Sequence, residues 1–122
     1  MELNNNLINL NNQPSWHRIR REGFLTNSTT TWTFSDTSFY DKTTTFMLRL
    51  GNATSSSSEA TYCRCLGSTI IPKDYLLIGH DNGNGCHQLQ YSNMNIGISF
   101  LSKEKIKVYA GQDCLVELMA WY

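Results

Sequence analysis

Short runs of alternating apolar and polar residues, separated by clusters of turn-forming residues, recur along most of this 122-residue chain. A period of two is the pattern of a half-buried β-strand, because successive side chains point to opposite faces. In the run at 45–50, for example, Phe46, Leu48 and Leu50 share one face. No stretch has the length and spacing of an amphipathic helix, so we expect a helix content near zero.

Eight or nine strands are predicted from these runs. The expected strands lie at 15–24, 30–34, 45–50, 60–66, 75–78, 88–91, 95–100, 105–109 and 114–122. The segments between them are rich in Gly, Asn, Asp, Ser and Thr, most clearly at 26–28, 35–37, 51–58, 81–85 and 110–113. Many short strands at regular spacing predict an all-β fold, an antiparallel β-sandwich that resembles a jelly-roll.

The last nine residues, Cys114–Tyr122, alternate and stay hydrophobic up to the final position. Chain ends are normally the loosest part of a domain unless a sheet or a partner chain holds them. We therefore expect the chain to end inside a buried strand. Symmetric association would bury the apolar face of this strand, so we also expect Leu118, Trp121 and Tyr122 to form an interface between copies.

The charges balance, with ten Lys and Arg against ten Asp and Glu, and charged residues make up only 16% of the chain. This balance argues against a general nucleic-acid-binding protein. Much of the polar surface comes instead from twelve Asn, twelve Ser and twelve Thr, which suit turns and contacts with sugars. We recognise no secretory signal and no membrane-spanning segment, so we expect no membrane insertion.

Residues 1–14 differ in composition from the rest of the chain. They are rich in Asn, their apolar anchors are Leu3, Leu7, Ile8 and Leu10, and Pro14 marks a boundary. Such a short run, poor in helix formers, predicts an arm that is either anchored on a neighbouring protein or disordered. We expect a single β-sandwich domain at 15–122.

The four cysteines are expected to be reduced and mostly buried, because nothing marks the chain for export. One group of residues has the chemistry of a zinc site, namely Cys63, Cys65, Cys86, His80 and His87. Its spacing does not match a zinc knuckle, and a disulfide within the group is an equal alternative. The loop at 81–85 predicts a hairpin turn more strongly than a calcium site, so we expect no metal and no cofactor.

A basic cluster lies at 17–21. Strict alternation would place Arg18 and Arg20 on one face, where they can pair with carboxylates of a neighbouring subunit. A patch for nucleic acid or acidic glycan is the alternative. We find no nucleophile elbow, protease signature or carboxylate pair, so the chain is not expected to be an enzyme.

Aromatic residues beside neutral polar loops are typical of sugar-binding surfaces, because a ring gives a stacking plate and the loops give hydrogen bonds. We therefore consider Trp32, Tyr40 and Tyr91 as candidate stacking residues, with Asn82 and Asn84 as candidate polar contacts. Core or subunit packing is the alternative for each ring.

The order of strands and turns in the second half of the chain is also characteristic. It runs through Ile70-Ile71-Pro72, Tyr75-Leu76-Leu77-Ile78, Gln88-Leu89-Gln90-Tyr91, the segment 106–113 and a closing Ala120-Trp121-Tyr122. This order resembles the C-terminal β-sandwich domains of tailed-bacteriophage fibre, tip and baseplate proteins, which also commonly begin with a Trp-led strand, as at Ser15-Trp16. The resemblance covers residues 15–122. It implies a structural role, assembly as a trimer and contact with host surface glycans or proteins.

We therefore expect a non-enzymatic virion protein, a fibre, tip or capsid-decoration subunit that assembles in the host cytoplasm. Its implied partners are copies of itself in a homotrimer, other virion proteins bound through residues 1–14, and a host glycan or protein contacted by loops at 52–58 and 81–85. The alternative is a free-standing lectin or carbohydrate-binding module that uses the candidate rings. A small hydrolase is a weaker third hypothesis for want of a motif.

Overall fold

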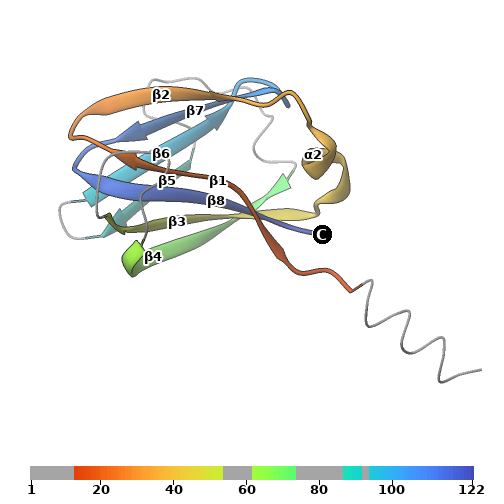
Figure 1. Ribbon diagram of the computed structural model, residues 1–122, viewed down its shortest axis with the longest axis horizontal. Coiled ribbons are helices and arrows are strands. Elements are labelled where there is room, and N and C mark those ends of the chain that lie inside the picture. Colours follow the sequence, from red (N-terminus) through yellow and green to blue (C-terminus); the bar gives the residue numbers. More distant parts are fainter. Residues whose placement is uncertain (1–12, 54–61, 74–86, 92–93) are drawn as a thin grey trace, which may run out of the picture.

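The computed structural model describes residues 13–53, 62–73, 87–91 and 94–122. These residues form eight strands and one short helix (Figure 1). In chain order the elements are β1 (Trp16–Phe24), β2 (Ser28–Thr33), α2 (Ser38–Lys42), β3 (Thr45–Ala53), β4 (Tyr62–Pro72), β5 (His87–Tyr91), β6 (Met94–Phe100), β7 (Lys105–Ala110) and β8 (Cys114–Trp121). The predicted all-β fold is confirmed.

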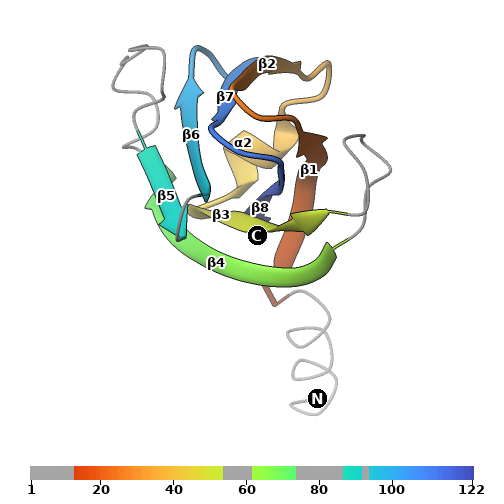
Figure 2. The same ribbon diagram turned by 90° about the vertical axis from the view of Figure 1, so that its left-hand side faces the viewer.

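The strands form two four-stranded antiparallel sheets. Sheet A has the order β1-β8-β3-β4 and sheet B the order β2-β7-β6-β5. The first two strands pair with the last two, β1 with β8 and β2 with β7, which is a jelly-roll type of winding. Strands β3 and β4 form a hairpin and β5, β6 and β7 a meander. Figure 2 shows sheet A curving beneath sheet B, with β4 beside β5.

The core lies between the two sheets and is filled by the residues that the alternation placed on inward faces. Its fully buried members are Trp32, Phe46, Leu48, Leu50, Ile71, Ile98, Ile106, Val108, Ala110, Val116, Leu118 and Ala120. Each large apolar side chain that leaves water contributes about 1.5–3 kcal/mol, so this set supplies most of the driving force for folding. An aromatic cluster fills one end, where the rings of Phe46 and Phe100 meet edge to face at 5.2 Å.

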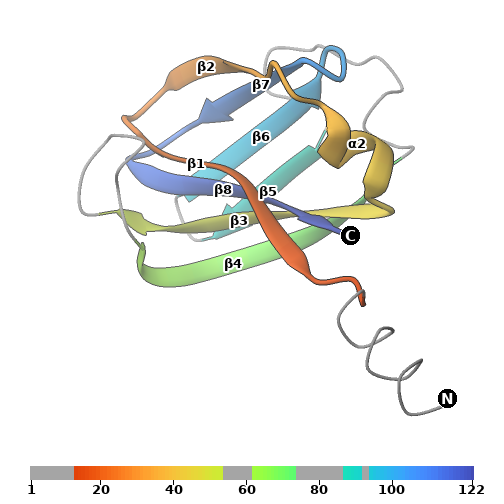
Figure 3. The ribbon, with the colours of Figure 1, turned by 45° about the vertical axis from the view of Figure 1, so that its right-hand side comes forward.

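Strand β8 lies in the interior of sheet A, where it pairs with β1 on one side and with β3 on the other. Its end is held by further hydrogen bonds. Ser15 and Tyr122 exchange two backbone hydrogen bonds of 3.0 and 3.1 Å, and the Thr43 hydroxyl donates to the carbonyl of Trp121 at 2.9 Å. The prediction that the chain ends inside a buried strand is confirmed, and Figure 3 shows this end beside the start of β1.

The helix α2 was not predicted. It occupies one end of the sandwich, where Phe39 and Tyr40 enter the core (Figure 3). The carboxylate of Asp36 accepts a hydrogen bond from the Ser38 N–H at 2.9 Å, and this bond lowers the pKa of the Asp36 carboxyl. Five residues are too few to show a helical period, so local sequence carries no signal for this turn. In the described part of the chain no helix is long and apolar enough to cross a membrane.

Several strand and turn boundaries in the structure differ from the predicted ones. The turn expected at 51–58 begins later, because β3 continues to Ala53 and pairs with an equally long β4. The turn at 26–28 is confirmed at the β1–β2 connection, where Asn27 has a φ of 55°. The expected strand at 75–78, the turn at 81–85 and residues 1–12 of the predicted arm lie outside the described residues. The division into an arm and a domain therefore stays a prediction.

Candidate functional site

The outer face of sheet A, which points away from the core, carries an apolar surface made by four strands. We call it the Trp–Met face and define it by Trp16, Met47, Ile70, Met119 and Trp121. The register places Met119 opposite Met47, Met47 opposite Ile70, and Trp16 opposite Trp121. The two indole rings meet edge to face at 5.2 Å. Ile70 is 55% exposed and the other four are half-buried, so a solvent-accessible apolar surface remains.

A row of charged residues borders the Trp–Met face. Glu117 of β8 lies between Arg21 of β1 and Arg49 of β3. Its carboxylate is 2.8 Å from the Arg49 guanidinium and 4.0 Å from that of Arg21. The Glu117 side chain is only 5% exposed, and a carboxylate so far removed from water needs such partners. The row therefore fixes β1, β8 and β3 to one another on the outer side of the sheet.

Arginine and lysine are distributed differently over the two sheets. All five arginines of the chain lie in strands of sheet A, and no lysine does. Arginine, tryptophan and methionine are enriched at the centres of protein interfaces, whereas lysine is depleted there. The strands of sheet A therefore carry arginine, the cationic residue that is enriched at interfaces.

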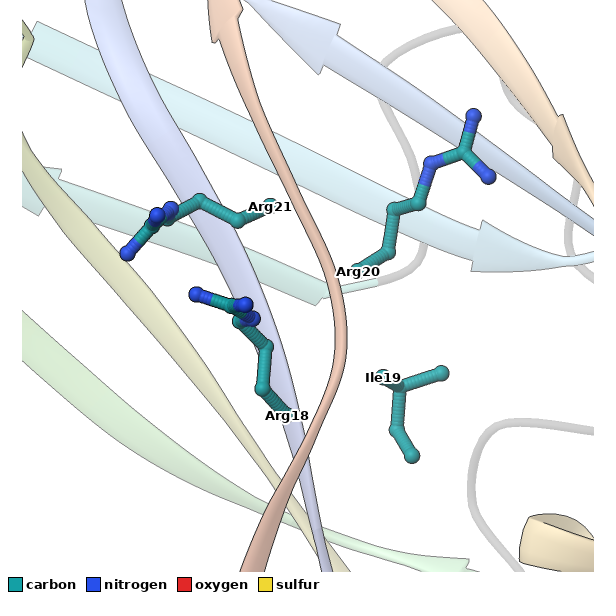
Figure 4. A pocket seen from close by; sticks show the side chains of 4 residues that line it. All are labelled: Arg18, Ile19, Arg20 and Arg21. Carbon is teal, nitrogen blue, oxygen red and sulfur yellow. The ribbon is translucent and has the colours of Figure 1, made fainter. Parts of the chain in front are cut away.

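A β-bulge in β1 redirects the basic cluster. Arg18 opposes Met119 and Arg20 opposes Leu118, so two residues that are not adjacent in β1 face adjacent residues in β8, and Ile19 is the extra residue. Figure 4 shows the result: Arg18 and Arg21 extend to one side of the strand, and Ile19 and Arg20 to the other. The prediction that Arg18 and Arg20 share a face is wrong, because it assumed an uninterrupted alternation.

Two hollows follow one another along β1, and we call them together the β1 groove. The first has a volume of about 350 Å3 and is lined by Arg18, Ile19, Arg20 and Arg21 (Figure 4). The second, of about 190 Å3, lies where β1 turns into β2. Its lining residues are Glu22, Gly23, Phe24, Leu25, Ser28 and Thr30. One half of the groove is thus strongly basic, and the other combines hydroxyls, one carboxylate and two apolar side chains.

Two of the three candidate stacking residues are in the core. Trp32 is fully buried and packs near Phe24, with ring centroids 6.3 Å apart. Tyr40 is 5% exposed and packs near Phe46 and Phe100. Neither ring can stack on a sugar, so the prediction of exposed plates at these positions is wrong. The period-two pattern of β2 places Trp32 on the opposite face from Thr31 and Thr33, and the structure shows that the face with Trp32 points into the core.

The remaining predicted site residues divide into three groups. Asn82 and Asn84 lie outside the described residues, as does the side chain of Tyr91 in β5. Leu118 is fully buried in the core of its own protomer, so its predicted place in an interface between copies is wrong. Trp121 and Tyr122 are half-buried. The Tyr122 ring stacks on His17 at 3.9 Å, whereas Trp121 belongs to the Trp–Met face.

The described cysteines differ in exposure. Cys65 is exposed and Cys114 is buried, and both are free thiols, so the expectation of mostly buried cysteines holds for one of the two. Within the described residues there is no group of three or more His, Cys, Asp and Glu that could hold a metal ion. The side chains of Cys63, Cys86, His80 and His87 lie outside this description, so the predicted absence of zinc stays a prediction.

The buried thiol predicts an alkaline limit to stability. Burial, and then the charge of Asp113, raises the pKa of Cys114 from 9.0 to about 12. Above pH 9 the unfolded state loses this proton before the folded state does, so the free energy of unfolding should fall between pH 9 and about 12. Urea unfolding at a series of pH values measures the effect. The Cys114→Ala variant should lose this component of the slope, and an unchanged slope would contradict the assignment.

Comparison with known proteins adds no relative. No protein-family model, no curated protein and no solved structure matches the chain. The similarity to phage β-sandwich domains therefore stays a prediction from the order of strands and turns.

Proposed function

We propose that this protein is a non-enzymatic structural subunit of a virion appendage or capsid, which assembles with copies of itself through the Trp–Met face and attaches to the host surface. Homotrimeric assembly is the form implied by the resemblance to phage fibre and tip domains. The observation that carries the proposal is the Trp–Met face itself, because one side of sheet A already covers the core and the other still presents tryptophan, methionine and isoleucine to solvent.

A second copy of this chain is the occupant that the face fits best. Interfaces between subunits are rich in aromatic residues, Met and Arg at their centre and carry mixed charges at their rim. The Trp–Met face has two tryptophans and two methionines, and Arg21 and Arg49 lie beside it. In a cyclic trimer one part of this face would meet a different part of the face on the next copy, and apolar residues of both parts would be buried.

The chain also enters the domain at the edge of this face. Ser15 is hydrogen-bonded to Tyr122, and the next residue, Trp16, contacts Trp121. Residues 1–14 therefore join the domain beside these two tryptophans. The apolar residues Leu3, Leu7, Ile8 and Leu10 precede Trp16 by six to thirteen residues along the chain. This placement supports an arm that connects the assembled subunits to another virion protein.

A charged substitution in the Trp–Met face tests the proposal. Ile70→Asp places a carboxylate on an exposed position, so we expect the fold to be kept and the oligomer to dissociate. Light scattering should give a trimer of 13.9 kDa chains for the wild-type protein and a single chain for the variant. The interface should lose at least about 2 kcal/mol, because an unpaired charge would be buried in it.

A matched variant controls for the added charge. Leu101 is 43% exposed in the β6–β7 connection, away from sheet A, and Leu101→Asp introduces the same group. It should leave the mass unchanged. A wild-type protein that is monomeric at every concentration tested, or an Ile70→Asp variant with the mass of the wild type, would refute assembly through this face.

A further inference from the structure

We infer that the β1 groove is a binding site for an acidic polysaccharide, with the arginine half holding a carboxylate or sulfate group and the hydroxyl half holding a neutral sugar. This inference rests on the attachment role in the proposed function and names the class of ligand for it. None of the five residues of the Trp–Met face lines the groove, and Phe24 and Ile19 connect the groove to the core.

The bulge at Ile19 is the first step of the argument. Arg18 and Arg20 both line the first hollow, and Figure 4 shows them extending to opposite sides of the strand. Ile19 packs against the core, which anchors the bulged backbone between them. Three arginines, Arg18, Arg20 and Arg21, therefore line one hollow on a single strand, and this concentration of positive charge favours an anion there.

Arg18 and Arg20 have no acidic partner among the described residues. The Glu117 carboxylate is already shared by Arg49 and Arg21. Within the described residues neither Arg18 nor Arg20 has an ion-pair partner, and the Nε atom of Arg20 is shielded from solvent without a hydrogen-bond acceptor. A buried donor without a partner is unfavourable by about 1–3 kcal/mol, so a shift of the Arg20 side chain that brings this donor to a ligand oxygen regains that energy. Guanidinium groups bind carboxylates and similar oxyanions in a bidentate manner.

The lining of the second hollow disfavours a polymer that is charged at every sugar. Glu22 would repel a second anionic group there, but its carboxylate can accept hydrogen bonds from sugar hydroxyls. Ser28 and Thr30 add hydroxyls, and Leu25, which is 59% exposed, adds an apolar surface for the face of a ring. The centres of the two hollows lie about four strand residues, or about 13 Å, apart along β1. The groove thus fits a polysaccharide in which charged and neutral sugars alternate.

A nucleic acid fits these observations less well. Its phosphates repeat at every nucleotide, so one of them would face Glu22, and the chain as a whole has no excess of positive charge. Within the described lining of the groove the aromatic residue is Phe24, which is 3% exposed and cannot stack on a base.

Calorimetry with four probes tests the inference: hyaluronan oligosaccharides, which alternate uronic acid with a neutral sugar, heparin oligosaccharides, dextran and single-stranded oligothymidylate. We expect binding to hyaluronan, weaker binding to heparin, in which nearly every sugar is charged, and none to dextran. A preference for hyaluronan supports the division into a charged and a neutral half, and a preference for heparin overturns the neutral half. The inference is overturned if neither acidic glycan binds or if oligothymidylate binds more tightly than both.

Two double variants with equal loss of charge identify the site. Arg18→Gln with Arg20→Gln should weaken binding at least tenfold, which corresponds to the loss of one charge-assisted hydrogen-bonding pair. Lys105→Gln with Lys107→Gln removes the same charge from β7 of sheet B and should change the affinity less than about twofold. Thr30→Val should weaken binding about threefold through the loss of one neutral hydrogen bond. Equal effects of the arginine and lysine pairs would mean that only net charge matters, and would overturn the site.

Measuring the oligomer mass of the same samples separates this inference from the proposed function. If the trimer persists and no acidic glycan binds, the groove assignment fails and assembly through the Trp–Met face stands. If Ile70→Asp leaves the mass unchanged while glycan binding follows the arginines, the assembly proposal fails and the groove assignment stands. Circular dichroism of each variant confirms that a loss of binding is not a loss of fold.

Discussion

Deletion of Leu118–Tyr122 should leave the chain unfolded, because these five residues belong to a strand in the interior of sheet A. The deletion removes two core side chains, Leu118 and Ala120. It also removes the strand that hydrogen-bonds to β1 and β3 along about half of each. A buried leucine alone is worth about 2–5 kcal/mol, and domains of this size are stable by only about 5–15 kcal/mol. Circular dichroism should show a loss of β-structure, and heating should show no cooperative transition.

Removing Tyr122 alone is the matched control. This residue lies beyond β8, and its backbone exchanges two hydrogen bonds with Ser15. Its removal should lower stability by about 1–3 kcal/mol and preserve a cooperative transition. A soluble, cooperatively folded protein that lacks residues 118–122 would contradict the central position of β8. A truncation that unfolds the chain cannot test oligomer formation, so a surface substitution such as Ile70→Asp is needed.

Replacement of Trp32 by alanine should lower the free energy of unfolding by about 3–5 kcal/mol, the range typical of a large aromatic side chain removed from a core. The ring is fully buried between the sheets, and no neighbouring side chain can fill the space without moving. Urea unfolding measures the change as a lower midpoint with an unchanged slope. An exposed sugar-binding ring would behave differently, because surface substitutions usually change stability by less than about 0.5 kcal/mol.

Two further variants show which property of Trp32 matters. The indole Nε1 has no hydrogen-bond partner, so Trp32→Phe loses volume and no hydrogen bond, and it should cost only about 1–2 kcal/mol. Thr31→Ala, at an exposed position on the same strand, should change stability by less than about 0.5 kcal/mol. If Trp32→Ala were as mild as Thr31→Ala, the ring would not be part of the core.

The proposed site was only partly predictable. The pattern at 45–50 separates Met47 from Phe46 and Leu48, which is the separation that the structure shows between the Trp–Met face and the core. The sequence also places three arginines in the first strand. It gives no sign that the strand is bulged at Ile19, because a bulge depends on the register with β8, a strand almost a hundred residues away. The β1 groove could therefore not be predicted.

Alternation along each strand is a local property, and it determined the fold class, most strand positions and the buried end of the chain. Runs such as Ile96–Phe100 and Lys105–Tyr109 are strands in the structure because their apolar residues fall on one face. A period of two separates the faces of a strand but does not say which strands become neighbours. Only the tertiary structure decided that β8 pairs with β1 and β3, that Glu117 meets Arg49, and that Trp32 and Tyr40 lie inside. Those outcomes depend on contacts between segments that are distant in the sequence. The arrangement that is formed is the one in which the whole molecule buries the most apolar surface and leaves the fewest charges unpaired.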